Sequence, residues 1–218
     1  MLTRLLALVA PVVLTAGCAN SIEFGPADPA RVTASASPWM IYQGSPSPSA
    51  GEPVPLAPDT VASGTFLPYR PGSTAITYDP AVVPPGATAA LAITKTPYGL
   101  VVRLTTGGLV PRRAYGAHLH TQPCTAVPDA AGPHYQHLHD PKAGSSPPPA
   151  DPAYANPRNE VWLDFTADAA GAASSVSEQR WMFSPQPPRS LVLHAGTTRT
   201  GAQVAGTAGA RVACLSLP

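Results

Sequence analysis

The chain has 218 residues, of which 44% are hydrophobic and only 11% are charged, with 29 prolines and 18 glycines. This length suits one domain with a leader and a linker, and so much proline and glycine excludes a mostly helical protein. The formal net charge is +1 and no basic stripe runs along the sequence, so we expect no nucleic-acid partner.

The first 18 residues have the pattern of an export signal. Arg4 precedes an apolar run over residues 5–14, and Thr-Ala-Gly-Cys then ends at Cys18. The run is too short to span a membrane and is typical of a secretory signal peptide. Its end resembles a bacterial lipobox, in which the cysteine is lipidated. We therefore expect residues 1–18 to be a lipoprotein signal peptide that leaves Cys18 anchored to the outer face of the bacterial cytoplasmic membrane. The alternative is an ordinary signal peptide beside an unrelated cysteine.

The cysteine count agrees with this interpretation. The chain has three cysteines, Cys18, Cys124 and Cys214. Lipidation of Cys18 leaves one pair, and an exported protein is expected to oxidise it rather than keep two free thiols. A bridge from Cys124 to Cys214 would close a loop of about 90 residues and constrain the unfolded chain by roughly 4 kcal/mol.

The remainder of the chain divides into a tether and a β-rich domain. Residues 19–62 are rich in Pro, Ala and Ser and are predicted to be an extended tether. Residues 63–218 are predicted to form the folded domain, because short β-prone runs alternate there with Gly/Pro turns, as in an antiparallel sandwich or barrel. The expected strands are 75–78, 89–94, 99–105, 160–166, 173–177, 190–194 and 211–217. The strandless segment 125–158 is long enough to suggest a functional loop.

Histidines gather in the middle of this domain. The chain has six, five of them between His118 and His139, while the sixth, His194, ends an apolar strand. Residues two apart in a strand point to the same face, so His118 and His120 can bind one metal ion from one side.

The histidines belong to an ordered set of motifs. Gly-Ala-His-Leu-His ends at His120, Ala-Gly-Pro-His at His134, Leu-Val-Leu-His at His194, and Gly-Ala-Arg-Val-Ala-Cys at Cys214; Thr166-Ala167-Asp168 and Gly171 form a further turn motif. In this order the motifs resemble the copper/zinc superoxide dismutase family over roughly residues 70–218. The resemblance implies an all-β fold, a Greek-key β-sandwich or barrel with a long metal-binding loop.

The resemblance also implies roles for single residues. His118, His120 and His194 are expected to be copper ligands, and His134 is expected to be the imidazole that bridges copper to zinc and supplies protons. Arg211 is expected to attract the superoxide anion, and Gly116 to let the backbone approach the copper ligands closely. Cys124 and Cys214 match the family's disulfide.

These roles imply a copper-dependent enzyme, a superoxide dismutase that converts superoxide to oxygen and hydrogen peroxide at the cell surface as an antioxidant defence. The alternatives are a non-catalytic lipoprotein that binds or sequesters copper with the same fold, and a structural lipoprotein with a degenerate site. Retention of Arg211 favours the enzyme. The sequence leaves the oligomeric state open, with a homodimer as one alternative, since the family often forms one.

The zinc half of the family pattern is not matched. The positions expected to hold the remaining zinc ligands are Arg158 and Val161, which do not bind zinc. The segment between His194 and Arg211 is also short and poor in acids, whereas the family's electrostatic loop is longer and charged.

A compact cluster of His137, His139 and Asp140 follows His134 instead, and three interpretations are open. The protein is a copper-only variant in which one acid hydrogen-bonds His134, or the cluster forms a rearranged zinc site with His134, or its histidines are solvated loop residues. The acids considered for the first interpretation are Glu160, Asp164 and Asp140.

Overall fold

In a computed structural model of the protein, residues 56–142 and 150–218 are described. The signal peptide, Cys18 and the tether up to residue 55 lie outside the described residues. Within the described part there is no helix that is long and apolar enough to cross a membrane.

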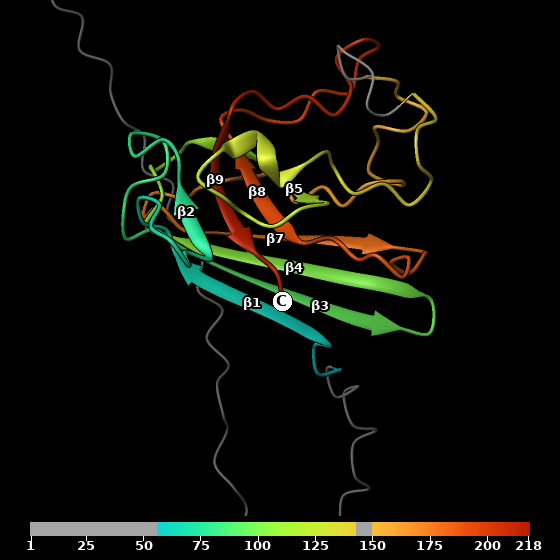
Figure 1. The fold of residues 1–218 in the computed structure, drawn as a ribbon, viewed down its shortest axis with the longest axis horizontal. Helices are drawn as coiled ribbons and strands as arrows, with labels where there is room; N and C mark the ends of the chain where they lie inside the picture. The colour runs from blue at the N-terminus through green and yellow to red at the C-terminus, as the bar shows by residue number, and fades with distance from the viewer. Residues whose placement is uncertain (1–55, 143–149) are drawn as a thin grey trace, which may run out of the picture. The chain divides into compact units, whose positions relative to one another are not determined.

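The described residues form two antiparallel sheets (Figure 1). A four-stranded sheet has the order β1-β3-β4-β7, and a five-stranded sheet has the order β2-β9-β8-β5-β6. Because β4 pairs with β7 rather than with β5, the chain crosses to the other sheet and returns, as in a Greek key. The elements are β1 (Thr60–Thr65), β2 (Ala75–Thr77), β3 (Thr88–Thr96), β4 (Gly99–Gly107), β5 (Ala114–His120), the 3-10 helix η1 (Pro128–Ala131), β6 (Phe165–Thr166), β7 (Ala173–Gln179), β8 (Ser190–His194) and β9 (Arg211–Ser216).

The core lies between the two sheets and follows from period-two alternation. In β4, Leu100, Val102 and Leu104 are buried while Arg103 and Thr105 are exposed. The inward side chains of β3 and β4 join Leu119, Leu191 and Leu215 of the other sheet in one apolar cluster. Burying one such side chain contributes about 1.5–3 kcal/mol, so this interface holds the sandwich together. The all-β sandwich expected from the sequence is confirmed.

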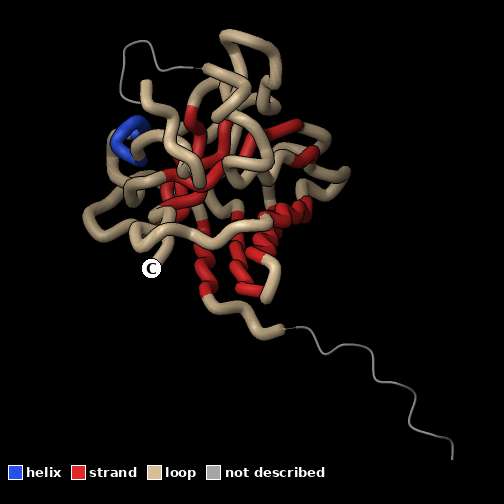
Figure 2. Tube along the Cα trace, turned by 90° about the vertical axis from the view of Figure 1, so that its right-hand side faces the viewer, coloured by secondary structure: helices blue, strands red, loops and turns tan. Residues whose placement is uncertain are grey.

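Long loops cover the outer face of the five-stranded sheet (Figure 2). Along β5, Ala117 and Leu119 belong to the sandwich core, so His118 and His120, which alternate with them and are fully buried, point to the opposite face. The loop between β5 and β6 covers this outer face and carries η1. The Cys124–Cys214 disulfide ties that loop to β9, which confirms the pairing expected from the cysteine count.

Two boundaries differ from the sequence prediction. β1 begins at Thr60, inside the predicted tether 19–62 and before the predicted domain start at residue 63. It was missed because it carries one large apolar residue and reaches the sheet only through its pairing with β3. The expected strand 160–166 is reduced to Phe165–Thr166, because the Asp164 carboxylate, rather than a backbone carbonyl, accepts the N–H of Ala117.

The junction of β4 and β7 yields a stability prediction. Gly99 has a φ of 139°, and a Cβ atom there would overlap the carbonyl oxygen of Gln179 in β7. Gly72 has a φ of 86° with nothing within 4 Å of an added Cβ. We expect Gly72→Ala to lower the free energy of unfolding by only its backbone strain, about 1–2 kcal/mol. We expect Gly99→Ala to cost clearly more, by about 1–3 kcal/mol of overpacking, as measured by urea unfolding. Equal losses in the two variants would contradict this account.

Candidate metal centre

The site lies on the outer face of the five-stranded sheet, where two neighbouring strands each present histidines. β5 pairs with β8 so that Gly116 is opposite His194 and His118 is opposite Val192. A register shift between Leu193 and His194 interrupts the pairing of β8 with β9 at the end of β8. The loop between β5 and β6 adds His134, which forms an isolated β-bridge with His120.

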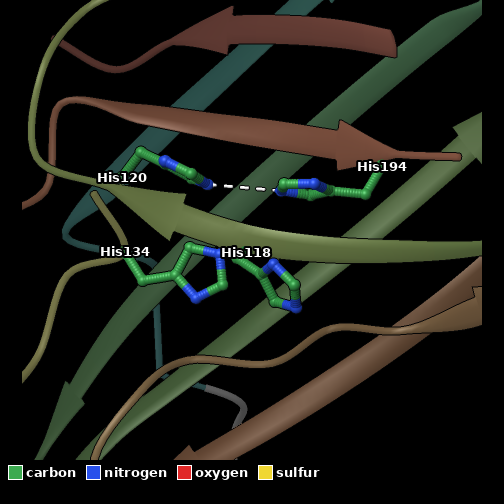
Figure 3. Close-up of side chains that lie close together, drawn as sticks. All are labelled: His118, His120, His134 and His194. Carbon is green, nitrogen blue, oxygen red and sulfur yellow. Dashed lines mark hydrogen bonds between the residues drawn. The ribbon is translucent and has the colours of Figure 1, made fainter. Parts of the chain in front are cut away.

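The four predicted copper ligands, His118, His120, His134 and His194, come together in the structure. Each offers one ring nitrogen, and these atoms all lie within 4.8 Å of one another. Figure 3 shows the rings of His120 and His194 facing each other across the dashed contact, and those of His134 and His118 drawn below β5 in this view. The Nε2 atoms of His120 and His194 are 3.4 Å apart.

Backbone carbonyls fix which nitrogen carries the proton in two of these rings. Nδ1 of His120 lies 2.9 Å from the Gly132 carbonyl oxygen, and Nδ1 of His194 lies 3.2 Å from that of Gly209. A carbonyl can only accept a hydrogen bond, so Nδ1 is the protonated nitrogen in both rings. Their Nε2 lone pairs therefore face each other.

Glu160 plays the same part for His134. One of its oxygens lies 2.8 Å from Nδ1 of His134 and accepts from the indole N–H of Trp162 at 2.7 Å, and the other accepts from Gln136 at 2.9 Å. Burial alone would raise the pKa of Glu160, but these hydrogen bonds outweigh it and hold that pKa below its usual value. Of the three acids considered as partners of His134, Glu160 is the one that fills the role.

The remaining ring, His118, has the opposite arrangement. Its Nε2 lies 2.6 Å from the hydroxyl of Thr198, which in turn donates to Asp164 at 2.7 Å. Its Nδ1 is buried and has no hydrogen-bond partner among the described residues. Asp164, considered above as a partner of His134, therefore serves His118. Thr198 was missed, because a lone threonine in a loop gives no sequence signal.

These hydrogen bonds leave four nitrogen lone pairs turned inward with no proton between them. Burial, and then the neighbouring histidines, lower the pKa of His118 to about 4 and that of His194 to about 3, so both rings are neutral at pH 7. Behind the rings lie two carboxylates, Glu160 and Asp164. Four buried neutral imidazoles with two negative charges around them fit a divalent cation, which would accept all four lone pairs and balance the carboxylates.

Arg211 lies beside this cluster, since it pairs with His194 in the sheet. Its Nη1 donates to the carbonyl oxygens of Pro128 and Asp129 at 3.2 and 3.4 Å. Its Nε is 3.7 Å from the exposed carboxylate of Asp129, in η1. The guanidinium is therefore held against η1 at the edge of the cluster, with a competing negative charge close to it.

The possible second metal site is not assembled. Among the described residues, the only cluster suited to a metal ion is the set of four histidines. The ring of His137 stacks on Trp181 with 4.8 Å between centroids, and His139 is exposed. Asp140 is buried, but its carboxylate accepts the backbone N–H of Lys142 instead of approaching His134.

The side of His134 that would face a second metal ion is filled by protein. Besides Glu160 and its donors, the β8–β9 loop (residues 195–210) closes over this side at Gly206. A Cβ atom at Gly206 would lie 3.1 Å from Ala155 and 3.9 Å from both Glu160 and the His134 ring. Gly116 serves the same loop: an added Cβ there would lie 2.6 Å from Ala208 and 2.8 Å from the Gly196 carbonyl oxygen.

The comparisons with known proteins give the following result. No family model matches the chain, and no curated protein matches it. Among solved structures, a Cu/Zn superoxide dismutase from Brucella abortus matches at 22% identity with a TM-score of 0.47, covering 73% of this chain and 98% of that one. Two mutants of a SOD-like protein from Bacillus subtilis match at 18% and 16% identity, each with a TM-score of 0.44, covering 59% of this chain and 88% of theirs.

One of these matches bears the name of the family that the sequence motifs resemble. At such identities and TM-scores they do not establish an activity, and the case for one rests on the site itself. The four-histidine cluster could hold a metal ion.

The lowered histidine pKa values predict how the metal-free protein responds to acid. An unfolded histidine titrates near 6.5, whereas His118 titrates near 4 in the folded protein. The unfolded chain therefore binds more protons in this interval, so the stability is complete above about pH 6.5 and is lost as the pH falls towards 4. His118 alone accounts for about 3 kcal/mol of this loss, as measured by urea unfolding against pH.

Two variants isolate this effect. The pKa of Asp164 is lowered to about 2, because the nearby His118 and the hydrogen bonds from Thr198 outweigh its burial, so its contribution is lost only below about pH 4. His118→Asn should flatten the profile between pH 6.5 and 4, while His139→Asn, on an exposed ring, should not. A profile equally steep in all three proteins would refute the assignment.

Proposed function

We propose that this protein is a copper-dependent superoxide dismutase of the copper/zinc superoxide dismutase family, and that it works without zinc. The observation that carries the proposal is the convergence of four imidazole lone pairs beside an arginine. His118, His120, His134 and His194 are the ligands, and Arg211 lies next to His194 in the sheet.

Copper is the metal proposed because of the donor set. Imidazole nitrogens suit copper, zinc, nickel and iron, and among divalent first-row ions Cu²⁺ binds such donors most tightly. Bound copper would supply the alternating one-electron oxidation and reduction that convert superoxide to oxygen and hydrogen peroxide. Among the described residues no thiolate competes for the metal, because Cys124 and Cys214 are joined in a disulfide.

The accessible side of the site lies at His134 and Arg211. The side chains of His134 and Arg211 are 16% and 20% exposed, whereas that of His118 is 0% exposed. A cationic guanidinium at the opening raises the local concentration of a small anion such as superoxide. Glu160 holds the Nδ1 proton of His134, so Nε2 is the atom of that ring that can take up a proton from solvent.

The zinc-free part of the proposal rests on Glu160. In the family that the motifs resemble, the bridging imidazole binds a second metal ion through its second ring nitrogen. Here that nitrogen, Nδ1 of His134, is bound to a carboxylate that is only 2% exposed and that two further donors hold in place. A fixed carboxylate can orient a metal-binding histidine and raise its basicity. We propose that Glu160 orients His134 in place of a zinc ion.

We further propose that the protein is exported and attached through a lipid on Cys18 to the outer face of the cytoplasmic membrane. The lipobox-like end of the leader and the oxidised pair Cys124–Cys214 support this location. Incorporation of a labelled fatty acid into the wild-type chain, and its loss in Cys18→Ala, would test it.

Metal content and turnover together test the activity. We expect protein loaded with copper alone to hold one copper ion per chain and to dismutate superoxide as fast as protein loaded with copper and zinc. His194→Ala should abolish both copper retention and turnover, because it removes one of the four donors. The measurements are metal analysis after dialysis and superoxide decay in stopped flow.

Other outcomes separate the alternatives. Tight copper binding without turnover would replace the enzyme by a copper-binding lipoprotein. Turnover that requires retained zinc would overturn the role given to Glu160 and point back to His137, His139 and Asp140.

The carboxylate beside Arg211 leads to a kinetic prediction. Asp129→Asn removes a negative charge 3.7 Å from Nε of Arg211, so the guanidinium should attract an anion more strongly. Because the pair is exposed and its interaction weak, we expect turnover at low ionic strength to rise by about two- to fivefold. The gain should shrink as salt screens the charges.

Glu178→Gln is a matched control for this variant, since it removes one exposed carboxylate from β7 of the other sheet. If Asp129→Asn and Glu178→Gln change the rate equally at every salt concentration, only net charge matters, and the specific role of Asp129 is refuted.

A further inference from the structure

A threonine and an aspartate from two separate segments meet behind His118. Thr198 belongs to the β8–β9 loop, and Asp164 immediately precedes β6. The Thr198 hydroxyl lies 2.6 Å from Nε2 of His118 and 2.7 Å from Oδ1 of Asp164. The backbone N–H of Thr198 donates to Oδ2 of the same carboxylate at 2.7 Å.

The direction of each hydrogen bond follows from the carboxylate. Both oxygens of Asp164 accept backbone N–H groups, Oδ1 that of Ala117 and Oδ2 that of Thr198, so the carboxylate acts as an acceptor. The Thr198 hydroxyl must then donate its proton to Asp164, which leaves it as an acceptor for His118. Nε2 of His118 is therefore the protonated nitrogen, and Nδ1 is the lone pair directed into the cluster.

Thr198 is needed because Asp164 does not reach His118 well alone. Oδ1 of Asp164 is 3.5 Å from Nε2 of His118, beyond the usual range of a strong hydrogen bond. The carboxylate is held in place by the N–H of Ala117, one residue before His118, at 3.2 Å. The branched Cβ of threonine also restricts its side-chain rotamers, so the hydroxyl between the two groups is pre-positioned.

We propose that Thr198 and Asp164 are a positioning pair that fixes His118 as an Nδ1 donor to the metal, through the threonine hydroxyl. The proposal rests on the metal centre of the proposed function and deepens it. His118 is then the one ring of the four that offers Nδ1, and the β8–β9 loop becomes part of the metal centre through a residue that binds no metal itself.

The tautomers can be observed without metal. In the metal-free full chain, two-bond ¹H–¹⁵N correlation spectra should show His118 protonated at Nε2, and His120, His134 and His194 protonated at Nδ1. Thr198→Val keeps the shape but removes the acceptor, so the His118 signals should move towards a mixture of tautomers. Thr198→Ser should restore the wild-type pattern.

Copper binding provides a second measurement. Loss of a group that orients a metal ligand typically lowers metal affinity by about 10–100-fold, and we expect this for Thr198→Val, together with an altered Cu²⁺ electron paramagnetic resonance spectrum. Thr198→Ser should bind as wild type does. Thr207→Val is the matched control, because Thr207 lies in the same loop and its hydroxyl bonds only to the Val204 carbonyl oxygen.

A second variant guards against misfolding. Asp164→Asn keeps an accepting oxygen but removes the charge, and it should weaken copper binding less than Thr198→Val does. Circular dichroism and urea unfolding verify that each variant is folded.

The outcomes distinguish this inference from the proposed function. If Thr198→Val keeps the His118 tautomer and the copper affinity of wild type, the positioning pair is refuted, even if wild type dismutates superoxide. If wild type lacks turnover but Thr198→Val shifts the tautomer and weakens copper binding, the enzyme proposal fails and the positioning pair stands.

Discussion

Four buried imidazole rings direct nitrogen lone pairs towards one another, and the hydrogen bonds of the rest of the site depend on this arrangement. Such a cluster is electrostatically unfavourable unless every ring is neutral and gives its one proton to an acceptor on its outer side. The acceptors are the Gly132 and Gly209 carbonyls, Glu160 and Thr198. They come from different segments, so the loops must be ordered before the cluster can exist.

The sandwich provides the base on which these loops can be ordered. Alternation along β5 gives Leu119 to the core and leaves His118 and His120 on the outer face. The long loop is fastened to that face by the Cys124–Cys214 disulfide and by Tyr78, whose hydroxyl donates to the Thr125 carbonyl oxygen. The β8–β9 loop approaches closely because Gly116 has no side chain. Stability of the fold and readiness of the metal centre therefore depend on the same contacts.

Charge is distributed unequally around the cluster. Glu160 and Asp164 lie behind His134 and His118, where they can balance a divalent cation, while Arg211 lies at the accessible edge, where it can attract an anion. The buried side of His134 is occupied by a carboxylate and closed by the β8–β9 loop at Gly206. In the family that the motifs resemble, the corresponding imidazole binds a second metal ion, whereas that of His134 is hydrogen-bonded to Glu160. We therefore propose a single copper ion as the occupant.

Regular patterns in the sequence determined much of this protein. Strand alternation predicted most of the strands and the shared face of His118 and His120, and the spaced motifs brought in His134 and His194. Patterns failed where single polar residues act across the fold. Tertiary structure alone decided that Glu160 binds His134, that Asp164 and Thr198 serve His118, and that His137 stacks on Trp181 instead of joining a second site. The physical reason is that a hydrogen bond between loops depends on where those loops meet in space. No period or spacing in the sequence predicts the partner of an isolated threonine or carboxylate.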